Sequence, residues 1–462
     1  MGLFAAGMSA LSVLQHRAFE TGRFDVGNLT QAVWSTAHGR FLEVTDLQGR
    51  QISRLGAHFD PIVAVLAPAW RLWPHPSLLL VTQAVAVAFG AVPVFLLARK
   101  HLESEWAGLA FAVVYLLYPP TQWLVLDDFH PVALATPLLL AAVWFLDEER
   151  VVPFAACAAL ASLTKEQVGL AVAALGLWYA LAHGRRLAGA AIALAGTVVA
   201  GVAVVVVVPH YAPGGGSPFA GRYAEIGGSP AGVVSTLVTD PLRVLGAATS
   251  RHDLAYLADL VLPLAGLAVL APALALTALP EIALNVLSST RTQTSIHFHY
   301  TAAAIPGLVA ASVLGAARLR RRLPRLAPAV PAGAAAVTLL AGVVLGPLPL
   351  WRDVPFGSRL GTRDHVVTAH DRVAAEALRR VPPDAVVSAT NTLGAHLSAR
   401  RRIYSFPVVR DATWIAVDTT RPSYLDDAVA PARFRLALRQ LLSDPGWRVV
   451  FSRDGVLLLR RR

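Results

Sequence analysis

Acidic, basic and histidine side chains occur in five short motifs at the edges of apolar segments. The motifs are FDVG from Phe24, HFDP from His58, DDFHP from Asp127, TKEQ from Thr164 and HFHY from His297. Ionisable groups at a membrane boundary are costly to keep and are commonly retained for function. These motifs therefore define the candidate site, and we expect them to share one cavity.

Carboxylates in the first two motifs could serve as general bases. Asp25 is the foremost candidate and Asp60 the second, while His58 could orient a base or bind substrate. The alternative interpretation is structural. Asp25 would cap a following helix, and Asp60 would cap a helix that begins at Pro61.

The DDFHP motif places three titratable groups next to one another. Asp127, Asp128 and His130 have no adjacent cation in the sequence, so they could hold a divalent metal ion, and Asp128 and His130 could bind substrate. One of the acids could equally cap a helix that starts at Pro131. The sequence implies no cofactor beyond that cation.

Lys165 and Glu166 interrupt an apolar stretch, which is expensive unless they pair or face a cavity. Lys165 is one of only two lysines, and a compact ammonium group suits phosphate binding. The alternative is a structural turn at the membrane interface.

A second group of candidate phosphate or metal ligands surrounds the HFHY motif. Histidines two residues apart lie on one face of an extended chain. They could also be interfacial belt residues. Glu281, after Pro280, is expected to face the same cavity. The candidates are Arg291, His297, His299 and Tyr300.

The elements that carry these motifs are apolar. The chain has 462 residues, of which 15% are charged, and its mean hydropathy is +0.55. These values predict an integral membrane protein. The net charge of +11 comes without a basic stripe interleaved with aromatics, which argues against nucleic acid.

The apolar runs predict an α-helical polytopic protein with about eleven transmembrane helices. Residues 61–73 are too short to cross and are predicted to lie at the interface. The first span is the amino-terminal run, which begins at residue 1. The others are 77–98, 105–118, 131–146, 152–163, 167–182, 188–208, 254–270, 272–288, 300–317 and 329–350.

The distribution of basic residues predicts the orientation. With the amino terminus inside, the predicted cytoplasmic loops hold ten Lys and Arg residues and the short outer loops hold two. All five motifs then lie on the outer face. So do loop 19–60, with an interfacial helix around Val26–Trp34, and loop 209–253, whose glycines and prolines predict an irregular lid.

The sequence predicts two domains, a multispanning membrane domain over residues 1–350 and a small extracytoplasmic α/β domain over 351–462. The second should contain helices at 365–380 and 434–444, strands DAVVSA, RRIYSF and TWIAVD, and a hairpin turning at Asp454–Gly455. Nucleotide loops and metal-ligand spacings do not occur in its sequence.

The motifs together carry a resemblance. FDVGNLTQAVW with HFDPI, LLYPPTQWLVLDDFHP, LTKEQ, and ALPEIALNVLSS followed by IHFHY resemble the DUF2079 family of predicted bacterial membrane proteins. That family is similar in layout to the GT-C glycosyltransferases. In relatives a second acid tends to follow the first motif, whereas this chain has Thr30.

The resemblance implies a multi-pass protein of the bacterial plasma membrane with its carboxyl-terminal domain outside. A GT-C-like enzyme would move a sugar from a polyprenyl-phosphate donor to a cell-envelope acceptor at the outer face. The expected partners are the lipid-linked donor, that acceptor and membrane lipid. Two alternatives stay open, a transporter or flippase of a lipid-linked or small polar substrate, and an inactive scaffold.

Overall fold

The protein, seen in a computed structural model, is described over residues 1–215, 219–423, 426 and 431–462. These residues form two compact units. The helical unit comprises Met1–Met8, Gly56–Asp60 and Gln83–Thr362, and the sheet unit comprises Ser9–Leu55, Pro61–Thr82 and Arg363–Arg462. This division does not test the predicted boundary near residue 350 between a membrane domain and an α/β domain, which stays a prediction.

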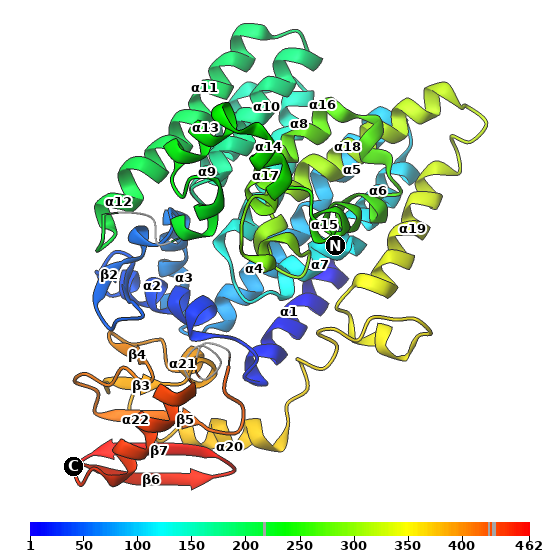
Figure 1. The fold of residues 1–462 in the computed structure, drawn as a ribbon. Coiled ribbons are helices and arrows are strands. Elements are labelled where there is room, and N and C mark those ends of the chain that lie inside the picture. The colour runs from blue at the N-terminus through cyan, green and yellow to red at the C-terminus, as the bar shows by residue number, and fades with distance from the viewer. Residues whose placement is uncertain (216–218, 424–425, 427–430) are drawn as a thin grey trace. The chain divides into compact units, whose positions relative to one another are not determined.

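The helical unit is built from helices joined by short turns (Figure 1). Two helices run from one unit into the other, α1 (Gly2–Arg17) and α4 (Ser77–Phe89). The remaining helices are α5 (Ala91–Leu102), α6 (Glu105–Leu117), α7 (Pro119–Leu126), α8 (Ala135–Asp147), α9 (Val151–Ser162), α10 (Val168–Ala182), α11 (Arg186–Val202), α12 (Val208–Tyr211), α13 (Pro230–Thr239), α14 (Pro241–Ala247), α15 (Arg251–Val261), α16 (Pro272–Ala275), α17 (Leu279–Val286), α18 (Ala304–Arg322) and α19 (Val330–Leu345).

Helices occupy the predicted ranges, but a count of eleven crossings is not confirmed. Within the described chain, Ser77–Leu102 and Arg186–Tyr211 are long and apolar enough to cross a membrane. The pair α6 and α7, bent by 48° where Pro119 begins α7, would add a third if it is one span. The predicted span 254–270 is wrong as one helix. It breaks after Val261 into short 3₁₀ turns, where Pro263 removes a backbone donor and Gly266 has a φ of 66°.

Helices α10 and α11 form an antiparallel pair (Figure 1). Their backbones meet at glycines. A Cβ on Gly169 would lie 2.5 Å from the carbonyl oxygen of Gly196, and one on Gly176 would lie 2.6 Å from that of Gly189. The clashes are reciprocal, since a Cβ on Gly196 would lie 2.4 Å from the Gly169 oxygen. Small residues at such crossings let apolar helices pack closely in a membrane.

The region 209–253 is more regular than its composition predicts. Residues 216–218 of the predicted lid lie outside the described residues. The rest contains the 3₁₀ segment η6 (Ala220–Ile226) and the helices α13 and α14. Prolines do not prevent these helices, because each proline is the first residue of its helix. The N–H of a first helical residue makes no hydrogen bond within the helix, so proline, which lacks this N–H, costs nothing there.

The sheet unit contains a five-stranded mixed sheet in the order β4-β3-β5-β7-β6. Strand β3 pairs in parallel with β4 and β5, while β7 pairs antiparallel with β5 and β6. The predicted hairpin is confirmed, with Asp454 and Gly455 both at positive φ as a tight two-residue turn requires. The strands are β3 (Val387–Ala389), β4 (Ile403–Ser405), β5 (Trp414–Asp418), β6 (Trp447–Arg453) and β7 (Val456–Arg461).

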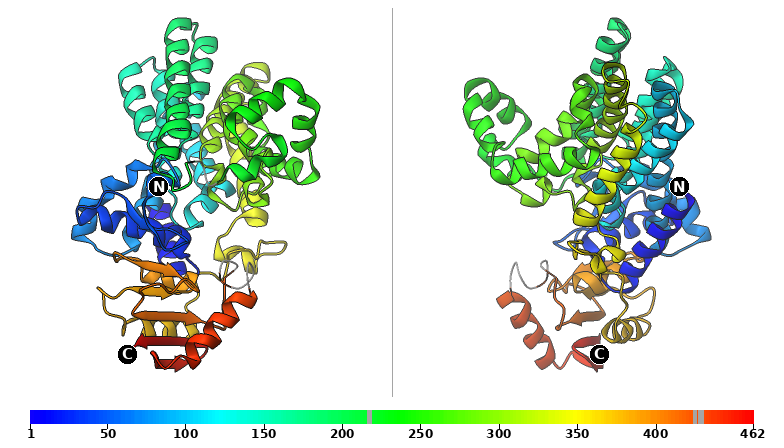
Figure 2. Two further views of the ribbon diagram at one scale, coloured as in Figure 1. Left: turned by 60° about the vertical axis from the view of Figure 1, so that its left-hand side comes forward. Right: turned by 90° about the vertical axis from the view of Figure 1, so that its right-hand side faces the viewer.

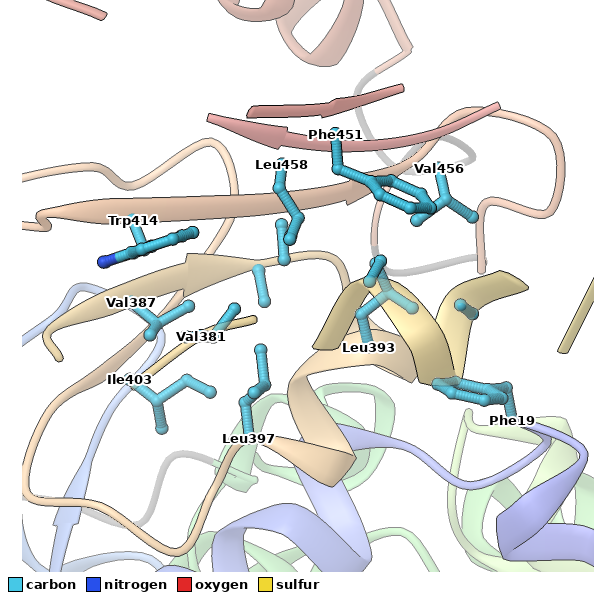
Figure 3. Packing of buried hydrophobic residues seen from close by; sticks show 14 residues of the cluster. Phe19, Val381, Val387, Leu393, Leu397, Ile403, Trp414, Phe451, Val456 and Leu458 are labelled. Carbon is cyan, nitrogen blue, oxygen red and sulfur yellow. The ribbon is translucent and has the colours of Figure 1, made fainter. Parts of the chain in front are cut away.

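Different helices cover the two faces of this sheet (Figure 2). Along β5, Trp414 and Ala416 face the cluster that contains Leu393, while Ile415 and Val417 face the cluster that contains Phe434. Alternation of this kind follows from the two-residue period of a strand. Figure 3 shows the first cluster. Helices α20 (Ala369–Leu378) and α21 (Asn391–His396) cover that face, and α22 (Pro431–Ser443) covers the other.

The rest of the sheet unit comes from the early part of the chain. The helix predicted near Val26–Trp34 is observed as α2 (Asn28–Ala37), with Leu29 and Val33 buried. Its placement at the membrane interface stays a prediction. Helix α2 follows one π-helical turn, η1 (Arg23–Gly27), and precedes the two-stranded ladder β1 (Glu43–Thr45) and β2 (Gln51–Ser53). Residues 61–72 form η3 (Pro61–Leu66) and α3 (Ala67–Leu72).

Candidate active site

The first element of the site is a carboxylate–histidine pair in the helical unit. Glu166 Oε1 lies 3.0 Å from His58 Nδ1, and Glu166 Oε2 accepts the backbone N–H of Phe59 at 3.0 Å. The loop between α9 and α10 therefore fixes the segment Gly56–Asp60 through both carboxylate oxygens. The aromatic ring of Phe219 stacks on the His58 imidazole, with ring centroids 4.6 Å apart.

A second pair joins the end of α7 to the segment before α18. Asp127 Oδ2 accepts the backbone N–H of His299 at 2.7 Å and lies 3.0 Å from Nδ1 of the same residue. His130 stacks on His299 with ring centroids 3.5 Å apart, and its Nε2 lies 3.5 Å from Asp127 Oδ2. The predicted DDFHP and HFHY motifs thus meet at Asp127.

Two cations lie against Tyr300, the residue that follows His299. Lys165 Nζ is 5.4 Å from the centre of the Tyr300 ring, and the Arg222 guanidinium is 5.8 Å from it. Arg222 also lies 4.5 Å from the ring centre of Phe219. A cation over an aromatic face is held there by the ring quadrupole and keeps its hydrogen-bond donors for other partners.

Burial and charge set the protonation of the two pairs. Burial alone would raise the pKa of Glu166, but the charge and hydrogen bond of His58, with the charge of Lys165, lower that pKa to about 2. Burial lowers the pKa of His299, and the charges of Lys165, His58 and Arg222 lower it further. At neutral pH Glu166 is therefore ionised, whereas His299 is neutral and donates its Nδ1–H to Asp127.

Polar side chains beneath the site hold its backbone in place. Gln83 Nε2 donates to the carbonyl of Asp128 at 2.6 Å, and its Oε1 accepts the N–H of His130 at 2.9 Å. Asn285 on α17 donates to the carbonyl of Tyr300 at 2.7 Å. Glu281, on the same helix, has its Oε1 3.4 Å from Gln167 Nε2 and interacts electrostatically with Lys165.

Asp127, His130 and His299 suit a divalent metal ion by type and position. Their potential ligand atoms all lie within 4.8 Å of one another. Two imidazoles and one carboxylate form a donor set that zinc commonly uses, and neutral His299 keeps a lone pair on Nε2 while its Nδ1–H is held by Asp127. The sequence analysis grouped Asp128 with Asp127 and His130 and treated His299 separately. Asp128 has a φ of 48° and lies in the turn between Asp127 and His130, where its carbonyl accepts from Gln83.

The structure places the remaining predicted residues as follows. Asp25 lies within η1 of the sheet unit, and the N-cap of α2 is Gly27, so Asp25 does not occupy the predicted capping position. Asp60 is 1% exposed and lies in the helical unit.

His297 packs on Trp123, with ring centroids 4.7 Å apart. Arg291 is exposed in a 3₁₀ turn, where its carbonyl faces His252.

Sequence reasoning missed Arg222, Phe219 and Gln83. Arg222 and Phe219 lie in a glycine-rich stretch with no charge pattern to mark them. Gln83 lies inside a continuous apolar helix. A buried amide needs hydrogen-bond partners, so a single glutamine in such a helix is the one sequence signal that could have identified it.

Comparison with known proteins agrees with this architecture. The chain belongs to DUF2079, a family of predicted membrane proteins, whose model matches residues 15–458. Among solved structures it is similar to the crystal structure of ArnT from Cupriavidus metallidurans in the apo state, with a TM-score of 0.53 and 14% sequence identity over 94% of this chain and 93% of that chain. ArnT is a GT-C glycosyltransferase, so the fold of this chain is GT-C-like. No curated protein sequence matches the chain.

Proposed function

We propose that this protein is a glycosyltransferase that moves a sugar from a polyprenyl-phosphate donor to an acceptor at the outer face of the bacterial plasma membrane. The observation that carries the proposal is the pairing of two cations, Lys165 and Arg222, on Tyr300 beside two carboxylate–histidine pairs. The GT-C-like fold supports it. Fold alone does not define a reaction, so the argument depends on the site.

In the proposed reaction an acceptor hydroxyl attacks the anomeric carbon of the sugar. A carboxylate takes the hydroxyl proton, the new carbon–oxygen bond forms, and the bond from carbon to phosphate oxygen breaks. The polyprenyl phosphate leaves with the electron pair. Cations placed where this charge develops lower the barrier, because they act in a site with little water.

Lys165 and Arg222 are the groups we assign to the departing phosphate. Lys165 offers a point charge, while the Arg222 guanidinium, stacked between two rings, offers planar paired donors that match phosphate oxygens. Glu166 is a poor general base, since its pKa of about 2 is far below neutral pH. We assign it the role of holding His58 in position.

Asp25 is the carboxylate we propose as the base for the acceptor. It is half-buried in a π-helical turn, a local structure that is rare and frequently found at functional sites. Asn391 anchors this turn by accepting the N–H of Phe24 at 3.2 Å. Asp60 is too deeply buried to contact an acceptor, and we assign it a positioning role.

The metal triad has a defined place in this proposal. An ion held by Asp127, His130 and His299 would supply a further positive charge near the phosphate of the donor.

Donor binding and transfer can be tested separately. We expect Lys165→Gln to weaken binding of a polyprenyl-phosphate sugar about tenfold or more, since a charge-assisted contact is lost. Asp25→Asn should bind the donor normally but not transfer the sugar. The matched control is Lys100→Gln, the other lysine, which pairs with Asp147 and Glu148. Equal donor binding by Lys165→Gln and wild type would contradict the proposal.

A further inference from the structure

A second candidate site lies in the sheet unit, apart from the residues described so far. It is a cavity of about 540 Å³ between the end of α1 and the helices α20 and α21. Its lining includes three arginines, Arg17, Arg372 and Arg379. None of these arginines forms an ion pair or a side-chain hydrogen bond with any residue in the described ranges.

The cavity carries an excess of positive charge. Arg372 lies in α20 and Arg379 is its C-cap residue, still with helical φ and ψ. The two are seven residues apart, which is about two helical turns, so they share one face. Among the described lining residues the one acid is Asp371. It is already engaged, because its Oδ1 accepts from Arg421 at 2.7 Å and its Oδ2 accepts from the backbone and hydroxyl of Thr368 at 2.6 and 2.7 Å.

The remaining lining is largely apolar. Leu14, Phe19, Leu378 and Leu397 contribute hydrocarbon surface. His396, also in the lining, stacks on Phe19 with ring centroids 4.0 Å apart. Its buried Nε2 has no hydrogen-bond partner among the described residues. The cavity therefore combines arginine side chains that have no anionic partner among the described residues with an apolar surface beside them.

We propose that this cavity binds a phosphate ester carried on an apolar chain. Guanidinium groups match phosphate oxygens in a planar, paired geometry, and the three positive charges of these arginines exceed the two negative charges of a phosphate monoester. Leu14, Phe19 and Leu397 would cover the first carbons of the chain. The chain belongs to a family of predicted membrane proteins, so lipids that carry a phosphate group are among the molecules it meets.

The test is calorimetric titration of the purified full-length protein in a neutral detergent. Three probes separate the contribution of the phosphate group from that of the apolar chain: hexyl phosphate carries both, inorganic phosphate only the first and hexanol only the second. We expect hexyl phosphate to bind more tightly than either of the other two. Arg372→Gln and Arg17→Gln, which change different helices, should each weaken hexyl phosphate binding about tenfold.

Two control variants make the result specific. Arg448→Gln removes an exposed arginine of β6 in the same unit and should leave binding unchanged. All titrations are repeated in the Lys165→Gln background, which weakens binding at the proposed active site and so separates that site from this cavity. Equal binding of inorganic and hexyl phosphate would overturn the role of the apolar surface. Unchanged binding in both arginine variants would overturn the site.

Discussion

Glu166 holds His58 across 108 positions of sequence, with Oε1 and Nδ1 3.0 Å apart. Because Glu166 is ionised, His58 donates the Nδ1–H in this bond. The second carboxylate oxygen accepts from Phe59 N, so a single side chain fixes both the ring and the backbone of the HFDP motif. This relationship brings two motifs together that are far apart in the sequence.

The first prediction concerns pH and the stability contributed by Glu166. Its pKa falls from the usual 4.5 to about 2 in the folded protein. A carboxyl with a depressed folded pKa stabilises the fold fully above its unfolded pKa, and the contribution is lost as pH falls through the folded pKa. The melting temperatures of wild type and Glu166→Gln should therefore differ most above pH 4.5 and converge toward pH 2.

The measurement is thermal unfolding at several pH values in this range. Glu225→Gln, which replaces an exposed glutamate of the same unit, is the matched control. A wild-type advantage over Glu166→Gln that is equally large at every pH would show that the charge of Glu166 does not stabilise the fold.

The second prediction separates charge from shape at Arg222. Arg222→Lys keeps the charge but loses the planar group that stacks on Phe219 and Tyr300. We expect it to weaken donor binding about fivefold, as loss of a cation–π contact would, and Arg222→Gln to weaken binding more. Titration with a polyprenyl-phosphate sugar measures both. Arg251→Gln, an exposed arginine of the same unit, serves as control, and full binding by Arg222→Gln would remove Arg222 from the site.

The third prediction concerns metal. If Asp127, His130 and His299 form a zinc site, the protein should retain about one equivalent of zinc after reconstitution and dialysis. His130→Ala should lose it. His297→Ala should retain it, because His297 packs on Trp123. Elemental analysis by mass spectrometry gives the metal content without an activity assay. Equal zinc content in wild type and His130→Ala would exclude this triad as the site.

The fourth prediction tests the glycine contact between α10 and α11. A Cβ on Gly196 would lie 2.4 Å from the Gly169 oxygen, whereas one on Gly201 of the same helix meets nothing within 4 Å. Overpacking costs about 1–3 kcal/mol, and alanine otherwise favours a helix over glycine by about 1 kcal/mol. Gly196→Ala should lower the melting temperature, and Gly201→Ala should maintain or raise it. Equal effects would show that the helices can separate without cost.

Local features of the fold could be predicted from the sequence. The spacing of Leu29 and Val33 predicted the helix that buries them. The pair Asp454–Gly455 predicted the hairpin, because a tight two-residue turn needs positive φ at both positions and few residue types other than Asp, Asn and Gly adopt it. The short helix α21 was missed, since six residues leave little periodic signal. The break at Pro263 and Gly266 was missed because continuous hydrophobicity outweighed the two residues that interrupt a helix.

The site was predicted in part. Motif positions identified His58, Lys165, Glu166, Asp127, His130 and His299, all of which lie in the helical unit. Their pairing could not be predicted, because it depends on contacts between loops more than one hundred residues apart. The sequence therefore left His299 as a candidate phosphate or metal ligand and Asp128 as a candidate substrate or metal ligand, without joining His299 to Asp127. The placement of Arg222 depends on packing against Tyr300, which leaves no local pattern in the sequence.

Sugar transfer is the most direct test of the central claim. Purified wild type, Lys165→Gln and Asp25→Asn would each be incubated with a panel of polyprenyl-phosphate sugars and envelope acceptors, and the products read by mass spectrometry. The proposal predicts turnover by wild type, and loss of turnover in both variants while each remains folded. Absence of transfer by wild type across the panel, or full activity in Lys165→Gln, would contradict it.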